Sequence, residues 1–187
     1  GSGTQILLLD QSTFTVGEDS EVVMDTFIFD PETNDGKIVA SVKQGSLKVI
    51  SGLISKKNPD SLTVEVPEGT LGSRGTEFQT IVSKGKTDTL LIGPGKNNTL
   101  GMRPGAVLVG NNLGQTLLDN PYRMTSMTKG TAPGQAKKIT KNQLKKFNKK
   151  MTALRVAKLS PNETKTERKQ LKKTLKKELK ALGFEKE

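Results

Sequence analysis

The sequence predicts a mainly β fold, a twisted antiparallel β-sandwich or solenoid-like domain, followed by a basic α-helical hairpin. Short apolar runs bounded by Gly, Asn, Asp and Pro succeed one another through residues 4–118, as in antiparallel β architecture. Val, Ile, Thr and Phe, which suit a pleated and half-buried surface, dominate these runs. Past residue 135 the apolar spacing becomes that of a helix and lysine becomes abundant.

Each predicted strand is one of these apolar runs. In the run over residues 61–66, three apolar residues alternate with Thr63 and Glu65, which indicates one buried face and one solvated face. Phe14, Phe27, Phe29 and Phe78 fall at strand positions, where core packing accounts for them. The predicted strands cover residues 5–9, 13–16, 21–29, 37–42, 47–50, 61–66, 78–82, 87–92, 98–102 and 106–109.

Two helices are predicted in the last third of the chain. The first covers residues 140–159 and places Leu144, Phe147, Met151 and Leu154 on one face. The second begins at a capping box formed by Ser160 and Glu163, with Pro161 at its first position. It carries a leucine stripe and ends at Gly183. The short link predicts an αα-hairpin whose two apolar stripes face each other.

Charge divides the chain in the same place. Residues 1–130 carry 12 Lys and Arg against 14 Asp and Glu, whereas residues 131–187 carry 18 against 5. A segment rich in Gly, Pro and small polar residues, which interrupt regular structure, follows residue 127. We therefore predict a β domain over residues 1–127, a linker over 128–138 and a basic helical hairpin over 139–187.

The composition argues against catalysis. The chain has no His and no Cys, which excludes Ser-His-Asp and Cys-His triads, a thiolate nucleophile and the usual zinc sites. No pair of carboxylates can be assigned as acid and base from the sequence, and no apolar stretch approaches the length of a membrane span. We expect a protein that is not an enzyme and that needs no metal and no cofactor.

Several segments resemble the FecR domain family. Residues 45–52 read GSLKVISG, residues 62–67 read LTVEVP and residues 72–78 read GSRGTEF. In the family a Gly-x-Leu strand precedes a strand ending in Thr-Pro-like residues, and an Arg-Gly-Thr-x-Phe signature follows. Here Val66 and Pro67 stand in the Thr-Pro place. Residues 3–12 are similar to the early strand and its Asp-Gly-Ser turn, with Gln11 replacing the glycine, and the resemblance covers residues 3–120.

The resemblance implies a compact β domain in the bacterial cell envelope, either periplasmic or at the cell surface. The best-known members sense an outer-membrane receptor and relay the signal to a sigma factor. Neither a cytoplasmic sigma-binding segment nor a transmembrane helix is visible in this sequence, so we expect a stand-alone module for protein interaction or scaffolding. Its partner would be an envelope protein or a second copy, bound through an edge strand or a loop.

The Arg-Gly-Thr signature allows two interpretations. Arg74 could contact a ligand at a loop tip, or it could hold strands together with its five donors. We expect the structural role, with the guanidinium folded back onto a neighbouring acid. The candidate acids are Glu65, Glu68 and Glu77. The residues assigned to this structural signature are Arg74, Gly75, Thr76 and Phe78.

The lysines of the hairpin form either a solvated face or a binding site for a polyanion. Few acids are placed to neutralise them. Arginine is scarce and the few aromatics are needed for packing, which favours an acidic polymer, an acidic protein surface or an anionic surface over nucleic acid. A nucleic-acid- or polyanion-binding protein is the alternative function, whereas our first hypothesis uses the hairpin as an assembly or anchoring arm. The candidate binding residues are Lys145, Lys146, Lys149, Lys150, Lys169, Lys172, Lys173, Lys176 and Lys177.

Overall fold

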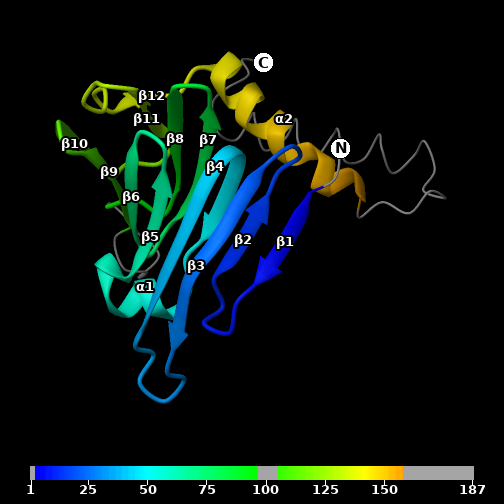
Figure 1. The fold of residues 1–187 in the computed structure, drawn as a ribbon, viewed down its shortest axis with the longest axis vertical. Helices are drawn as coiled ribbons and strands as arrows, with labels where there is room; N and C mark the ends of the chain where they lie inside the picture. The colour runs from blue at the N-terminus through cyan, green and yellow to red at the C-terminus, as the bar shows by residue number, and fades with distance from the viewer. Residues whose placement is uncertain (1–2, 97–104, 158–187) are drawn as a thin grey trace, which may run out of the picture. The chain divides into compact units, whose positions relative to one another are not determined.

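The computed structural model describes residues 3–96 and 105–157, and over these residues the fold is mainly β, as predicted (Figure 1). Two helices and a 3₁₀ turn accompany the strands in the described part. In chain order the elements are β1 (Thr4–Leu7), β2 (Thr13–Val16), β3 (Glu21–Phe29), β4 (Gly36–Ile50), α1 (Leu53–Lys57), η1 (Pro59–Ser61), β5 (Leu62–Val66), β6 (Gly69–Arg74), β7 (Glu77–Ser83), β8 (Lys86–Gly93), β9 (Ala106–Asn111), β10 (Gly114–Leu118), β11 (Arg123–Thr128), β12 (Lys137–Lys138) and α2 (Lys141–Ala157).

The described strands form one continuous 12-stranded sheet that curls at β4. The first part of β4 pairs with β3 and β5, whereas its second part pairs with β2 and β7. We call the strands β3, β5, β6, β9 and β10 with the first part of β4 the B half. The A half contains β1, β2, β7, β8, β11 and β12 with the second part of β4. Neighbouring strands are antiparallel, except that β4 and β5 run parallel.

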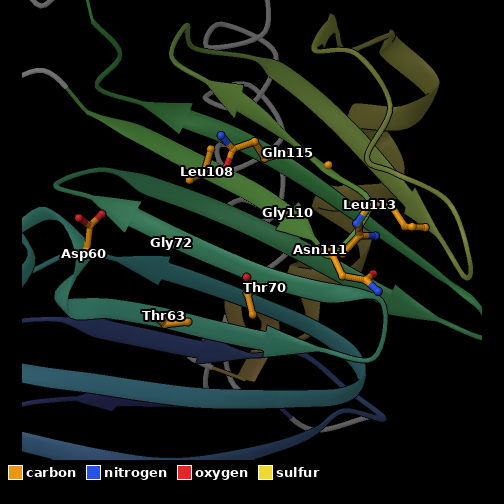
Figure 2. A pocket seen from close by; sticks show the side chains of 11 residues that line it. Asp60, Thr63, Thr70, Gly72, Leu108, Gly110, Asn111, Leu113 and Gln115 are labelled. Carbon is orange, nitrogen blue, oxygen red and sulfur yellow. The ribbon is translucent and has the colours of Figure 1, made fainter.

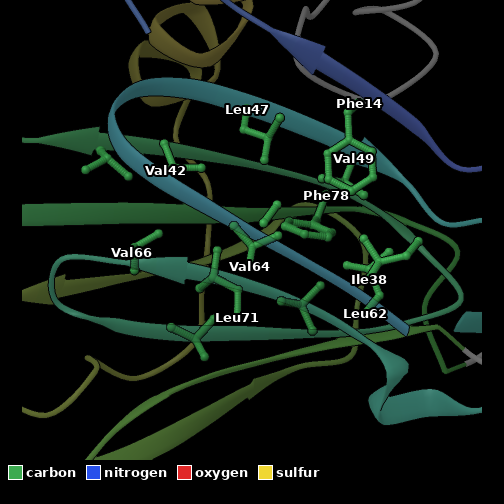
Figure 3. Packing of buried hydrophobic residues seen from close by; sticks show 14 of the residues in the cluster. Phe14, Ile38, Val42, Leu47, Val49, Leu62, Val64, Val66, Leu71 and Phe78 are labelled. Carbon is green, nitrogen blue, oxygen red and sulfur yellow. The ribbon is translucent and has the colours of Figure 1, made fainter. Parts of the chain in front are cut away.

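The bend of β4 at Gly45 allows both halves to bury the same core. Gly45 has φ +90°, a conformation that costs glycine little. Before the bend, Ile38, Ala40 and Val42 point into the core, whereas after it Leu47 and Val49 do so. The parity of the inward residues therefore changes at the bend. Figure 3 shows Leu62, Val64 and Leu71 of the B half packed toward Phe14, Leu47 and Phe78 of the A half.

Helix α2 covers the outer surface of the A half. Thr140 and Gln143 form a capping box at its start, because the Thr140 Oγ1 accepts from the Gln143 N–H at 3.3 Å and the Gln143 side chain accepts from the Thr140 N–H at 2.9 Å. Leu144 and Phe147 are buried, as are residues of the sheet that lie outside the central core. The buried apolar residues outside the central core are Ile81, Leu90, Met124, Ile139, Leu144 and Phe147.

Helix α2 makes a contact with the sheet that the predicted hairpin did not include. The helix starts and ends close to the predicted bounds, but its apolar face lies on the sheet, where the Gln79 Nε2 donates to the Phe147 carbonyl at 2.9 Å. The compact unit that contains the sheet runs from Gly1 to Leu154, and the predicted division at residues 128–138 stays a prediction. The predicted second helix lies outside the described residues. The polar residues of β7 and β8 gave no sign that a helix covers them.

The predicted strands at residues 13–16 and 21–29 match β2 and β3. The runs at 37–42 and 47–50 belong to one strand, β4, because Gly45 bends the strand without ending it. The prediction missed β6, β10, β11, β12 and the short helix α1, whose sequences are rich in Gly, Ser, Thr or Lys. The predicted strand at residues 98–102 lies outside the described residues.

Candidate functional site

The Arg-Gly-Thr signature forms the tight connection between β6 and β7. Gly75 adopts φ +55° and its N–H donates to the Ser55 Oγ at 3.0 Å. The Thr76 carbonyl accepts from the N–H and the hydroxyl of Ser51, and the Thr76 hydroxyl donates to the Pro94 carbonyl at 2.8 Å. Phe78 is fully buried in the core. These three residues join β4, α1 and the segment after β8 at one end of the sheet.

Arg74 does not make the ion pair that we expected. Its side chain is exposed on the outer surface of the B half, and it forms no ion pair with any residue that the structure describes. Glu77 pairs instead with Lys48 on the neighbouring strand, at 2.5 Å. Glu68 accepts a hydrogen bond from the Thr87 hydroxyl. The register explains the difference, because Glu77 lies opposite Ile50 on β4 and hence beside Lys48.

The Asp-Gln-Ser turn of the resemblance also has a structural role. The buried carboxylate of Asp10 accepts from the N–H and the hydroxyl of Ser12 and from the Ile54 N–H. It thereby satisfies a backbone donor at the start of α1. The Ser12 hydroxyl accepts from the Gly52 N–H. Gln11 adopts φ +68° at the position where the family has glycine.

A shallow groove crosses the outer surface of the B half (Figure 2). Its volume is about 570 Å³, and it is open to solvent. Small residues form its floor, and the register places Thr63 opposite Gly72 and Thr70 opposite Gly110. The residues that line the groove are Asp60, Thr63, Thr70, Gly72, Leu108, Gly110, Asn111, Asn112, Leu113, Gly114 and Gln115.

Exposed leucines stand on one side of this groove. Leu108 and Leu117 face each other across β9 and β10 and are 40% and 52% exposed, and Leu113 in the connecting turn is 56% exposed. These residues were not predicted from the sequence, although Leu108 continues the apolar run 106–109 on both faces of the strand. In the described part of the chain no three acidic side chains gather as metal ligands. The lining of the groove thus combines polar side chains with the two exposed leucines Leu108 and Leu113.

The outer surfaces of the two halves differ. The groove lies open, whereas α2 lies over Leu90 and Met124 of the A half and leaves both about 2% exposed or less. The edge of β10 is covered by residues 131–134, since the Thr116 hydroxyl donates to the Gly134 carbonyl at 3.0 Å. The pairing of the edge strand β3 with β4 is irregular between Glu21 and Val22 and again between Met24 and Thr26. Such irregularities disfavour regular pairing with a further strand. The open surface of the B half is therefore the clearest candidate for partner contact.

Four of the nine predicted binding lysines lie in the described part, on α2. Lys145, Lys146 and Lys149 are exposed and Lys150 is half-buried. Lys146 reaches Asp88 on the sheet, with 3.4 Å between the Nζ and the Oδ2. The other five candidates, Lys169, Lys172, Lys173, Lys176 and Lys177, lie outside the described residues.

The contact between Asp88 and Lys146 joins α2 to the sheet. The carboxylate of Asp88 is 7% exposed and also accepts from the Ser126 hydroxyl at 2.6 Å and from the Lys86 Nζ at 3.0 Å. Burial alone would raise the pKa of Asp88, but the hydrogen bonds from Ser126 and Lys86 and the charges of Lys86 and Lys146 outweigh it and lower that pKa. Asp88 is consequently ionised at neutral pH and holds both lysines.

Among the helices in the described ranges, none has the length and apolar character needed to cross a membrane. A family match and two fold relatives place the chain among known proteins. Residues 1–92 match the family described as FecR protein. No curated protein matches the chain.

Two crystal structures of a "putative anti-sigma factor" from Parabacteroides distasonis, at 2.50 Å and 1.65 Å resolution, share the fold. They are 10% and 11% identical to this chain, with TM-scores of 0.50 and 0.51 over 74% of it. The chain spans 56% of the length of those proteins. At this identity the likeness concerns the fold alone. The match over residues 1–92, which include the signature turn and the Asp-Gln-Ser turn, confirms the predicted resemblance to the FecR family.

Proposed function

We propose that this chain is a non-enzymatic interaction module of the bacterial cell envelope, periplasmic or at the cell surface, which takes part in signalling or scaffolding by binding a protein. The observation that carries the proposal is the open groove of the B half, which Leu108 and Leu113 line, with the exposed Leu117 beside Leu108. Exposed apolar residues gathered at one place are typical of protein contact. The FecR match supports a regulatory protein rather than an enzyme.

The partner would place apolar side chains against Leu108 and Leu117 on β9 and β10. The floor of the groove next to Leu108 holds no bulky side chain, because it is formed in part by Gly72 and Gly110. An added Cβ at Gly72 would meet no atom within 4 Å, so the floor has room for a partner side chain. The two fold relatives bear the name of a regulator that acts on another protein, which agrees with this mode of action. We assign assembly or anchoring to the lysine-rich C-terminal segment.

The test is a crosslinking pull-down from the native host with the full chain and two double variants. L108T/L117T removes the exposed leucine pair but keeps residues that suit a strand. The matched control L7T/L9T removes two exposed leucines at the N-terminal end of the A half, which are 72% and 81% exposed.

We expect a specific protein to be captured by the wild type and by the control, and its recovery to fall at least tenfold with L108T/L117T. If each leucine costs more than about 1 kcal/mol when it is removed, as central interface residues do, the pair accounts for a loss of that size. Equal recovery with all three proteins would refute the groove as the binding site. Loss with the L7T/L9T control alone would place the contact at β1 instead.

A further inference from the structure

Helix α2 presents a row of lysines to solvent. Lys141, Lys145 and Lys149 are four residues apart, so they lie on one face of the helix, with about 6 Å of rise between neighbours. All three side chains are exposed. None of the three forms an ion pair with a residue in the described ranges.

The row has little compensating negative charge along the chain. Between Asp119 and Glu163 the sequence contains no Asp and no Glu. Like charges four residues apart on a helix repel each other. Lys141 also lies in the first turn, where the helix dipole disfavours a cation and no acid is present. The arrangement therefore works against the stability of the helix unless an anion approaches it.

The packing of α2 fixes the direction in which the row points. Leu144 and Phe147 are buried against the sheet. The Phe147 carbonyl accepts from Gln79, and Lys146 is held by Asp88. The helix thus cannot turn its apolar face outward without losing these contacts, and the three lysines remain exposed to solvent.

We propose that the row formed by Lys141, Lys145 and Lys149 is a binding site for the surface of an anionic lipid bilayer. Lysines gathered on a helix next to a membrane are attracted by acidic lipid headgroups. Because the three lysines lie along one exposed side of the helix, all three can contact a flat surface at the same time. The buried positions of Leu144 and Phe147 mean that the contact is electrostatic and peripheral, without insertion into the acyl region.

The same row suits nucleic acid less well. Proteins that bind single strands combine a basic groove with exposed aromatic side chains, and the aromatic residue of α2, Phe147, is buried. Reading of a duplex relies mainly on arginine and on amides aimed at base edges, whereas this row consists of lysines alone. Duplex nucleic acid is the alternative ligand of the lysine row that the experiment must exclude.

The test is cosedimentation of the full chain with vesicles of phosphatidylcholine containing one quarter phosphatidylglycerol. The variant is K141Q/K145Q/K149Q. The matched control is K37Q/K43Q/R74Q, which removes three exposed cations from the outer surface of the B half and has the same net charge. Vesicles of phosphatidylcholine alone and a duplex DNA of 20 base pairs serve as the other probes.

We expect the wild type and the control to bind the acidic vesicles and not the neutral ones, and the binding to disappear with increasing salt. A lysine near an acidic membrane contributes about fivefold to binding, so the loss of three should weaken it by about ten- to 100-fold. Unchanged binding of the α2 variant would overturn the proposal, because the lysines beyond residue 157 would then suffice. Tighter binding to duplex DNA than to vesicles, lost with the same three lysines, would also overturn it.

Discussion

The contact between α2 and the sheet can be tested through Phe147. Its side chain is 1% exposed and lies in the buried apolar layer outside the central core. Truncation of a buried phenylalanine to alanine costs about 3–5 kcal/mol of the free energy of unfolding. In a domain of this size about 1 kcal/mol corresponds to about 2–4 °C. We therefore expect Phe147→Ala to lower the melting temperature by about 6–20 °C, measured by calorimetry or circular dichroism.

A second variant separates packing on the sheet from packing within a helical hairpin. Leu90 lies on β8, on the same surface as Gln79, which donates to the Phe147 carbonyl. If α2 covers this surface, Leu90→Ala should speed amide exchange in α2 as well as in β8. Leu113→Ala, at an exposed position, is the control and should change the melting temperature by at most about 1–2 °C. A small effect of Phe147→Ala, with exchange in α2 unaffected by Leu90→Ala, would refute the packing described above.

Four further substitutions test individual features of the fold. Gln11→Gly should raise the free energy of unfolding by about 0.5–1 kcal/mol in urea titration, because Gln11 has φ +68°. Thr76→Val should lower it by about 1–2 kcal/mol through loss of the hydrogen bond to Pro94, whereas the exposed Arg74→Ala should change it by less than about 0.5 kcal/mol. The lowered pKa of Asp88 means that its contribution is present above its ordinary pKa of 3.8 and is lost as the pH falls through the folded pKa. Asp88→Asn should therefore reduce the melting temperature at pH 7 and weaken its decline on acidification, and an unchanged acid decline would contradict this role.

The strands that could be predicted from the sequence are those in which apolar and polar side chains alternate. In β5, Leu62 and Val64 are fully buried and Glu65 is exposed, as the sequence pattern indicates. In β6 the pattern is hidden, because Gly72 and Ser73 carry no apolar signal and only Leu71 reaches the core. The pairing of β6 with β5 and β9 makes it a strand nevertheless. Its backbone hydrogen bonds, and not its side chains, determine its conformation.

The covering of the A half could not be predicted from the strands themselves. Gln79 and Asp88 look like residues of a solvated face, yet both are buried. A helix some sixty residues later lies over them and provides a partner to each, the Phe147 carbonyl to Gln79 and Lys146 to Asp88, which Ser126 and Lys86 also contact. A local pattern shows which face of a strand is apolar, but it cannot show which distant segment satisfies the polar atoms on the other face. For the same reason the stripe of α2 could be identified, whereas its contact with the sheet could not.

The groove could not be predicted for a different reason, because its residues come together only through strand pairing. Leu108 and Leu117 are adjacent only because β9 and β10 form a hairpin, and β10 itself was not predicted. A surface made of residues from four strands exists only once the register is known, so no single run of sequence contains it.

The two proposed binding surfaces can act independently because of the layer order. Along β7 and β8 alternate residues point to the core or to α2, so the lysine row lies beyond the outer surface of the A half. The groove lies on the outer surface of the B half, across the shared core. A bilayer held by α2 would therefore leave Leu108 and Leu117 accessible to a protein partner. Substitutions at these separate sites share no contacts, and their effects should add.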